Sequence, residues 1–269
     1  RSKYVQFLIF FICQYNSSFV ELYVSRILGR MLHPQSPIIT QRACAAYVAS
    51  FLSRAKYVKP MAVVTSLHHM VTWSSYYISE REKLQQHHGD YGHQSQHQQQ
   101  AIWLPGAKQH ETFYSVCQAC FYVICFVGLK YLVTETSDPE KKKTRENVIS
   151  LLQKLPWVQV IFSPLNPLKY CLHDVRNEFV NISKSTNLLK SRQEELEIRV
   201  SHIESIDGGE GYHGNGSSNS SSSGGCGVVS STSDDFVSGD NPLDSFFPFD
   251  PYLLSKSSAH VDPLYVVWS

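Results

Sequence analysis

Residues 44–55, CAAYVASFLSRA, decide the fold, because their apolar positions repeat with the period of an α-helix. This spacing places six apolar side chains on one helix face: Cys44, Tyr47, Val48, Phe51, Leu52 and Ala55. Small alanines surround that face, so a second helix can approach it closely. The stretch therefore predicts a helix that packs against a helical neighbour.

The helical period continues on both sides of this stretch. Residues 18–32 and 60–78 show the same apolar rhythm, and Pro60 suits the first turn of a helix. Ser36 and Pro37 predict the start of the first helix discussed, with Ser36 as its cap and Pro37 at its first position.

The second half of the chain is also predicted to be helical. Residues 111–132 are apolar almost all round, as expected of a central helix in a stack. Further helices are predicted over 148–155 and 167–189, whereas the charged run 138–146, DPEKKKTRE, is interpreted as a solvated loop. Helices of this length without intervening strands predict an all-α fold in which helix pairs stack one after another.

Two segments of low complexity interrupt the helical pattern. Residues 81–110 contain a tract rich in Gln and His, and residues 207–239 are rich in Ser and Gly, so both are predicted to be disordered insertions. They separate helical repeats at 1–80 and 111–206 from a strap rich in proline and aromatic residues at 240–269.

The composition excludes a strong overall electrostatic field. Lys and Arg number 24 against 23 for Asp and Glu, so any recognition by charge must come from local patches. The seven cysteines, without a leader peptide ahead of them, favour a reducing intracellular setting. The longest apolar run, 4–13, is too short to cross a bilayer, so no membrane association is expected. Because the chain begins with Arg1 rather than Met, we expect a fragment of a longer protein.

No motif in the chain predicts catalysis, a metal site or a cofactor. Gly209, Gly211 and Gly214 have G-x-G-x-x-G spacing, but no strand precedes them to build a dinucleotide site. Cys117 and Cys120 have redox spacing but lie in the apolar helical run, so they are interpreted as core cysteines. Hydrolase, metalloprotease and P-loop motifs do not occur, and we expect a protein that is not an enzyme.

A small basic group brackets the stretch 44–55. Arg42, Arg54, Lys56 and Lys59 could contact a phosphate backbone or an acidic partner. An ordinary polar helix face explains these residues nearly as well, so both interpretations stay open.

Four hydroxyl residues fit patterns that kinases accept. Ser231 and Thr232 are each followed by an Asp three residues later, and Ser36 and Ser163 each precede a proline. A phosphate on Ser36 would lie at a helix N-terminus, where free N–H groups stabilise negative charge. Such short patterns also occur by chance, and unmodified side chains remain the alternative.

The strap contains the most unusual sequence of the chain, NPLDSFFPFDPYLL at 241–254. An Asn or Asp followed by Pro recurs in it, which predicts single helical turns rather than one helix. Four aromatic side chains then project from an irregular segment: Phe246, Phe247, Phe249 and Tyr252. We expect the strap to fold back over a groove of the helical stack, and docking on another protein is the alternative.

Three blocks, in this order, resemble characteristic blocks of the RNA polymerase I-specific transcription initiation factor family of the TIF-IA type. They are PQSPIITQRACAAYVASFLSRAKYV at 34–58, LNPLKYCLHDVRNEFV at 165–180 and NPLDSFFPFDPYLLSKSSAHVDPLYVVW at 241–268. The resemblance covers nearly the whole chain apart from the two insertions, which suggest a plant member. It implies a HEAT-repeat-like α-solenoid of stacked antiparallel helix pairs, of which this chain is the C-terminal half.

The resemblance also implies a function. A member of this family is expected to be a nuclear, mainly nucleolar factor, with a cytoplasmic pool as a further expectation. It would bind RNA polymerase I and bridge it to the promoter-bound initiation factor at rRNA genes, without catalysis and under the control of kinases. The alternatives are a generic helical-repeat adaptor and a protein that contacts DNA through residues 42–59, either as its main role or as a weak accessory contact.

Overall fold

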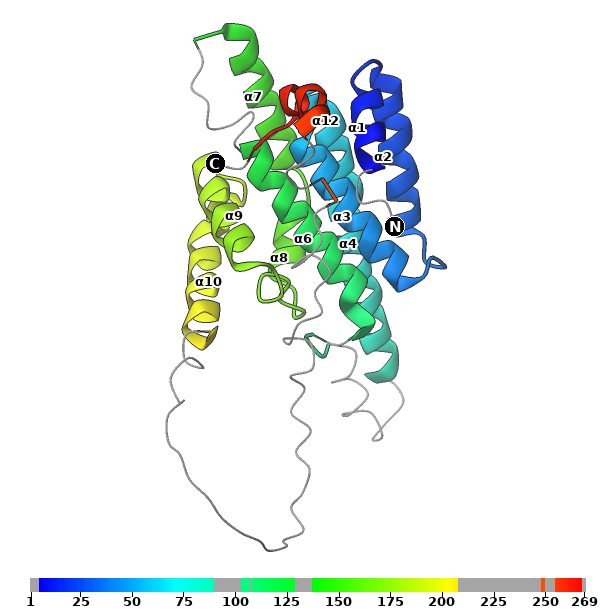
Figure 1. Ribbon diagram of the computed structural model, residues 1–269. Helices are drawn as coiled ribbons and strands as arrows, with labels where there is room; N and C mark the ends of the chain where they lie inside the picture. Colours follow the sequence, from blue (N-terminus) through cyan, green and yellow to red (C-terminus); the bar gives the residue numbers. More distant parts are fainter. Residues whose placement is uncertain are drawn as a thin grey trace, which may run out of the picture.

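The chain forms a stack of α-helices (Figure 1). A computed structural model describes residues 5–89, 103–106, 108–128, 137–207, 248–249 and 255–267. Within these ranges every regular element is helical, and the only extended pairing is an isolated antiparallel bridge between Ala55 and Tyr265. The prediction of an all-α fold is confirmed.

The α-helices are α1 (Gln6–Cys13), α2 (Ser17–Leu32), α3 (Ile38–Arg54), α4 (Pro60–Gly89), α6 (Glu111–Val127), α7 (Pro139–Leu152), α8 (Trp157–Ile161), α9 (His173–Thr186), α10 (Gln193–Asp207) and α12 (Ser255–Val261). Three short 3₁₀ turns are η1 (Lys108–His110), η3 (Lys190–Arg192) and η5 (Asp262–Leu264).

Helix α6 is the centre of the stack. It packs against α3 and α4 on one side and α9 on the other, while α1 and α2 lie at one end and α10 at the opposite end (Figure 1). All its residues from Phe113 to Val127 are buried. This burial explains the all-round apolar character of residues 111–132, because a helix with neighbours on every side has no face left for water.

Helix α3 lies between α2 and α6. The small residues Ala45, Ala46 and Ala49 are at most 3% exposed, so they allow close approach of the neighbouring helices. The helix begins at Ile38 rather than at Pro37. The predicted cap at Ser36 is therefore wrong by one residue: Pro37 is extended, with ψ of 140°, and its carbonyl accepts the first helical hydrogen bonds, from the N–H groups of Thr40 and Gln41.

The predicted charged loop at 138–146 is a helix. The Asp138 side chain accepts a hydrogen bond from the Glu140 N–H at 3.0 Å, and Pro139 occupies the first turn of α7. The charged side chains lie on the solvent side, while Val148 and Leu152 are buried. The Asp138-Pro139 pair starts this helix, as Asp-Pro pairs in the strap were predicted to start helical turns. Because the segment is so highly charged, the signal was not read as a helix start.

Two other boundaries differ from the prediction. Helix α9 begins at His173, not near Pro167, because Asn166 has a positive φ of 46° and the chain turns before the helix starts. Helix α4 continues to Gly89, beyond the predicted boundary at residue 80. Trp103 is half-buried, and its indole N–H donates to Gln85 Oε1 at 2.8 Å, so part of the predicted insertion contacts the helical stack.

In the part of the chain that the structure describes, no helix has both the length and the apolar character needed to cross a bilayer.

Candidate functional site

The C-terminal part of the chain is fastened to α1 and α3. We call the described residues 248–249 and 255–267 the C-terminal anchor. Phe249 has no exposed surface, its N–H donates to Ser50 Oγ at 3.3 Å, and the Pro248 carbonyl accepts from Gln6 Nε2 at 2.7 Å. The Phe249 ring lies 5.3 to 6.1 Å from four other aromatic rings: Phe7, Phe10, Tyr47 and Phe51.

A short backbone pairing completes the C-terminal anchor. The Lys56 N–H donates to the Leu264 carbonyl at 2.9 Å, and the Val266 N–H donates to the Arg54 carbonyl at 2.7 Å. The Tyr265 hydroxyl donates to the Phe249 carbonyl. These bonds join the end of α3 to the end of the described chain, so the two distant segments form one structural unit.

Arg54 and Arg42, two of the four predicted contact residues, are held inside the fold. Arg54 is only 7% exposed, and its guanidinium lies 4.7 Å from the centre of the Phe126 ring and 5.3 Å from that of Tyr265. Arg42 pairs with Glu111 at 2.6 Å and thereby connects α3 to α6. The interpretation of Arg54 as a surface contact is therefore corrected, because its guanidinium makes cation–π contacts inside the fold.

Lys56 and Lys59 are the exposed members of the predicted basic group. They follow α3 and precede α4, beside the C-terminal anchor. Affinity for a nucleic-acid backbone rises with the number of phosphates that Lys and Arg side chains neutralise. Two exposed lysines can neutralise only about two phosphates, which is too few for a continuous basic surface.

The four predicted modification sites have different surroundings. Ser163 is 3% exposed, so a kinase could reach it only after local opening, which argues against the predicted phosphorylation at this residue. Ser36 is half-buried in the turn between α2 and α3. Ser231 and Thr232 lie outside the described residues, as do the strap residues Phe246, Phe247 and Tyr252.

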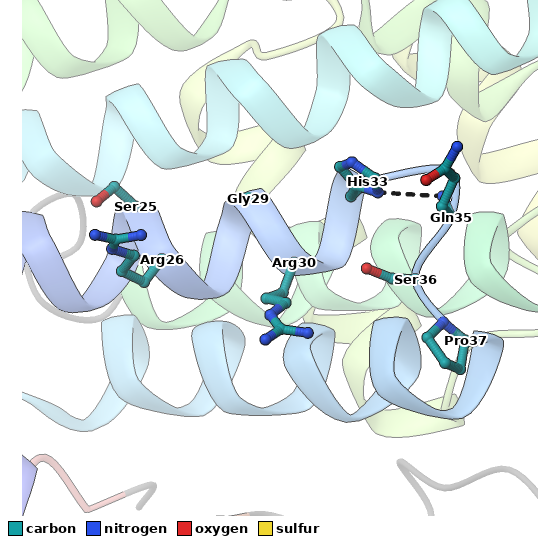
Figure 2. A pocket seen from close by; sticks show the side chains of 8 residues that line it. All are labelled: Ser25, Arg26, Gly29, Arg30, His33, Gln35, Ser36 and Pro37. Atoms are coloured by element: carbon teal, nitrogen blue, oxygen red, sulfur yellow. Dashed lines mark hydrogen bonds between the residues drawn. The ribbon is translucent and has the colours of Figure 1, made fainter.

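A hollow of about 770 Å3 lies along α2 and the turn that follows it, and we call it the basic groove. Figure 2 shows the guanidinium groups of Arg26 and Arg30 on α2 and the turn that carries Ser36. His33 Nδ1 accepts a hydrogen bond from the Gln35 N–H at 3.2 Å. The lining of the basic groove contains no Asp or Glu. It consists of Ser25, Arg26, Gly29, Arg30, His33, Gln35, Ser36 and Pro37.

A second hollow, of about 520 Å3, lies between α2 and α3, and we call it the apolar groove. Ile39, on its rim, is 77% exposed. Its lining is Tyr23, Ile27, Ile39, Thr40, Ala43, Cys44 and Tyr47. Tyr47 also contacts Phe249, so the apolar groove ends at the C-terminal anchor.

The basic groove was missed by the sequence analysis, although a signal was present. Arg26, Gly29, Arg30 and His33 follow the spacing i, i+3, i+4 and i+7, which places them on one helix face. The apolar positions of this helix, on which its prediction rests, lie on the opposite face, where Val20, Val24, Leu28 and Met31 are buried.

No disulfide joins the cysteines in the described part of the chain. Cys117 and Cys120 are almost fully buried in α6, as their interpretation as core residues predicted, and burial raises the pKa of both thiols. Among the residues that the structure describes, no group of three or more His, Cys, Asp or Glu side chains could hold a metal ion.

Comparison with known proteins gives a consistent result. The family model described as RNA polymerase I specific transcription initiation factor RRN3 matches residues 1–269. The chain is 30% identical over 275 aligned positions to the RNA polymerase I-specific transcription initiation factor RRN3 of Mus musculus, covering 99% of this chain and 34% of the mouse protein. It is 23% identical to the corresponding factor of Schizosaccharomyces pombe, covering 100% of this chain and 36% of that protein.

A solved structure supports the fold. The chain is similar to the crystal structure of RNA polymerase I transcription initiation factor Rrn3, with a TM-score of 0.62 and 18% identity. The similarity covers 97% of this chain and 44% of that one. The chain spans about a third of the length of the curated relatives it matches.

Proposed function

Because the chain belongs to the family of RNA polymerase I specific transcription initiation factors RRN3, we propose that it takes part in transcription initiation at rRNA genes. In this proposal the protein binds RNA polymerase I and bridges it to a promoter-bound factor. It acts in the nucleus and nucleolus, with a cytoplasmic pool, and it does so by binding rather than by catalysis.

The observation that carries the proposal is the family match over all 269 residues. It runs through both insertions and includes the C-terminal anchor, so it does not depend on one short motif. The all-helical fold is consistent with a scaffold, since stacked helices offer long surfaces at fixed separation.

The surfaces of the stack suggest how a bridge would work. The C-terminal anchor holds the last described residues against α1 and α3, which stiffens the end of the stack that carries both grooves. In our proposal kinases control one of the contacts by adding charge. Ser36 supports this idea, because a phosphate there would lie beside Arg26 and Arg30 in the basic groove.

Affinity capture from nuclear extract tests the proposal. Two baits are compared, this chain and a version extended at its N-terminus, and bound proteins are identified by mass spectrometry. Three large side chains near the start of this chain are 57% to 70% exposed: Leu8, Tyr15 and Leu22. Exposed apolar side chains retain proteins unspecifically, so a bait whose N-terminal extension can cover them is compared with the shorter one.

The expected result is recovery of RNA polymerase I subunits or the rRNA promoter factor, without RNA polymerase II. A matched control bait carries Leu8→Ser and Leu22→Ser, which should remove unspecific retention and leave the specific partners. If folded baits of both lengths recover neither partner, the bridging function is refuted and a generic helical-repeat adaptor becomes the better description.

The DNA-contact alternative has weaker support. Of its four residues, only Lys56 and Lys59 are exposed, and the net charge of the chain is +1. It predicts DNA affinity that falls with salt and with Lys56→Ala and Lys59→Ala. If the double variant binds DNA as tightly as the unmodified chain, Lys56 and Lys59 do not contact DNA.

A further inference from the structure

We propose that this chain's own acidic segment 234–240, DDFVSGD, docks on the outer face of α2 and α3. In this arrangement Asp234 and Asp235 meet Arg26 and Arg30 in the basic groove, and Phe236 enters the apolar groove. The lining of the two grooves and the distribution of charge in the chain support this arrangement, which is independent of the proposed function.

The basic groove is prepared for an anion. Arg26 and Arg30 are exposed, and within the described part of the chain neither side chain has a salt bridge or hydrogen bond. The two side chains lie one helical turn apart on α2 (Figure 2). Exposed guanidinium groups at this spacing can each donate to a carboxylate.

The backbone around the groove also favours negative charge. Helix α3 starts beside it, and no side chain caps the first N–H groups of α3. At the end of α2, the His33 carbonyl is occupied, because it accepts from the Ser36 N–H at 3.0 Å and from Gln41 Nε2 at 2.8 Å. The N–H groups at the start of α3 and the guanidinium groups of Arg26 and Arg30 both favour an anion here.

The apolar groove adjoins the basic groove. On α2, Arg26 lines the basic groove and its chain neighbour Ile27 lines the apolar groove. At the start of α3, Pro37 lines the first and Ile39, two positions on, lines the second. A ligand that spans them needs negative charge next to a bulky apolar side chain, which a nucleic-acid backbone does not offer and an Asp-Asp-Phe sequence does.

The charge of the segment is complementary to the groove. Between the end of α10 at Asp207 and the start of α12 at Ser255, the sequence contains no Lys or Arg. Its acidic residues in that interval are Glu210, Asp234, Asp235, Asp240, Asp244 and Asp250. Within this interval, only Asp234 and Asp235 are adjacent carboxylates followed directly by an aromatic residue.

The chain length brings the segment to the correct place. Phe249 contacts Tyr47, which lines the apolar groove, and Phe236 precedes Phe249 by 13 positions. Thirteen residues reach at most about 47 Å when extended. The helical path from Tyr47 to Ile39 is only about 12 Å. A tether of this length gives a local concentration on the order of millimolar, so even a weak contact would be occupied.

Phosphorylation would strengthen this docking. Ser231 and Thr232 lie three residues before Asp234 and Asp235, respectively, and a phosphate there would add charge to the same acidic run. The two predicted kinase sites would then act on a contact within the chain.

Fluorescence anisotropy with a labelled synthetic peptide tests the proposal. The probe is residues 230–241, SSTSDDFVSGDN. It is titrated against the full chain and against an open variant in which the chain's own segment carries Asp234→Ser, Asp235→Ser and Phe236→Gly. We expect the peptide to bind the open variant at least about fivefold more tightly, because the tethered segment competes in the unmodified chain.

Groove substitutions identify the binding surface. Arg26→Glu with Arg30→Glu, added to the open variant, should weaken peptide binding at least about tenfold. The matched control is Lys142→Glu with Lys143→Glu on α7, two exposed cations away from the grooves, with an expected change within about twofold. A peptide phosphorylated on Ser231 and Thr232 should bind the open variant at least about threefold more tightly.

Three outcomes would overturn the proposal. Equal affinity of the peptide for the full chain and the open variant would mean that the groove receives acidic segments of other proteins instead. No binding to the open variant, or binding unchanged by the Arg26 and Arg30 substitutions, would mean that the groove is not the docking surface. Arg26→Gln with Arg30→Gln, checked by circular dichroism, excludes loss of folding as the cause of a weakened signal.

Discussion

Arg54 Nη1 donates a hydrogen bond to the Val266 carbonyl at 3.2 Å, although 212 positions separate the two residues in the chain. The guanidinium is packed between the rings of Phe126 and Tyr265, so it joins α3, α6 and the C-terminal anchor in one contact. The C-terminal residues are thus part of the helical core.

Replacing Arg54 by Ala should destabilise the fold by about 2 kcal/mol or more, since the variant loses a buried hydrogen bond and the packing of the guanidinium. Arg54→Lys should recover little of this, because an ammonium cannot stack between two rings as a planar guanidinium does. Urea denaturation followed by circular dichroism measures both. The control is Lys56→Ala, an exposed neighbour, for which a change below about 0.5 kcal/mol is expected. A change as small as this for Arg54→Ala would contradict the role assigned to the contact.

Replacing Phe249 by Ala should release the C-terminal anchor. The side chain is fully buried among four aromatic rings, and removing such a side chain typically costs about 3 kcal/mol or more. Hydrogen exchange should then accelerate in α12 and η5 more than in α9 and α10. Val267→Ala is the control, because Val267 is 67% exposed. Equal acceleration in all helices would show global unfolding rather than release of one segment.

Asp138 should stabilise α7 as an N-cap. Asp138→Ala removes the acceptor of the Glu140 N–H and should cost about 1 kcal/mol. Asp138→Asn should be nearly neutral, since Asn caps equally well, and this variant separates capping from charge. Thermal unfolding at matched pH gives the comparison. Similar losses for Asn and Ala would show that charge, not the hydrogen bond, stabilises the helix.

The cysteines should differ in their reaction with iodoacetamide at pH 8. Burial raises the pKa of the Cys117, Cys120 and Cys125 thiols well above the ordinary value of 9.0, so they remain protonated and shielded in the folded chain. Cys44 is half-buried, so it should be labelled first among these four. Peptide mass spectrometry over time tests the order. Labelling of Cys117 as fast as that of Cys44 would contradict the central position of α6.

The same thiols give the fold a pH dependence with a defined sign. A folded-state pKa above the unfolded value means that the folded chain holds these protons more tightly. Their contribution to stability is therefore complete below the ordinary thiol pKa of 9.0 and is lost as the pH rises above it. Denaturation at neutral and alkaline pH should show this loss.

Local patterns carried most of the fold prediction. The apolar spacing in α3 and the all-round apolar sequence of α6 identified both helices, because their burial depends on the period of neighbouring residues. The first part of helix α7 was missed because its exposed charged face dominates the sequence, with only Val148 and Leu152 buried in the whole helix. The start of α9 was placed too early from the Asn-Pro pair at 166–167, because the chain turns at Asn166, where φ is 46°, and the helix begins only at His173.

The contacts of the candidate site were less accessible to sequence reasoning. The aromatic residues of the strap indicated burial, but nothing local could show that Phe249 meets Phe7 and Phe10 across the chain. For the same reason Arg54 was interpreted as a surface residue, since its partners Phe126 and Tyr265 are distant in sequence. The basic groove was the exception, because the helical spacing of Arg26, Arg30 and His33 was visible in the sequence.

The central claim is a role in initiation by RNA polymerase I, and a depletion experiment tests it most directly. A nuclear extract is depleted with an antibody against this chain, and transcripts from an rRNA promoter and from an RNA polymerase II promoter are counted in parallel. We predict that depletion removes only the rRNA transcript and that the N-terminally extended protein restores it. Complete depletion with unchanged rRNA transcription, or equal loss of both transcripts, would contradict the account.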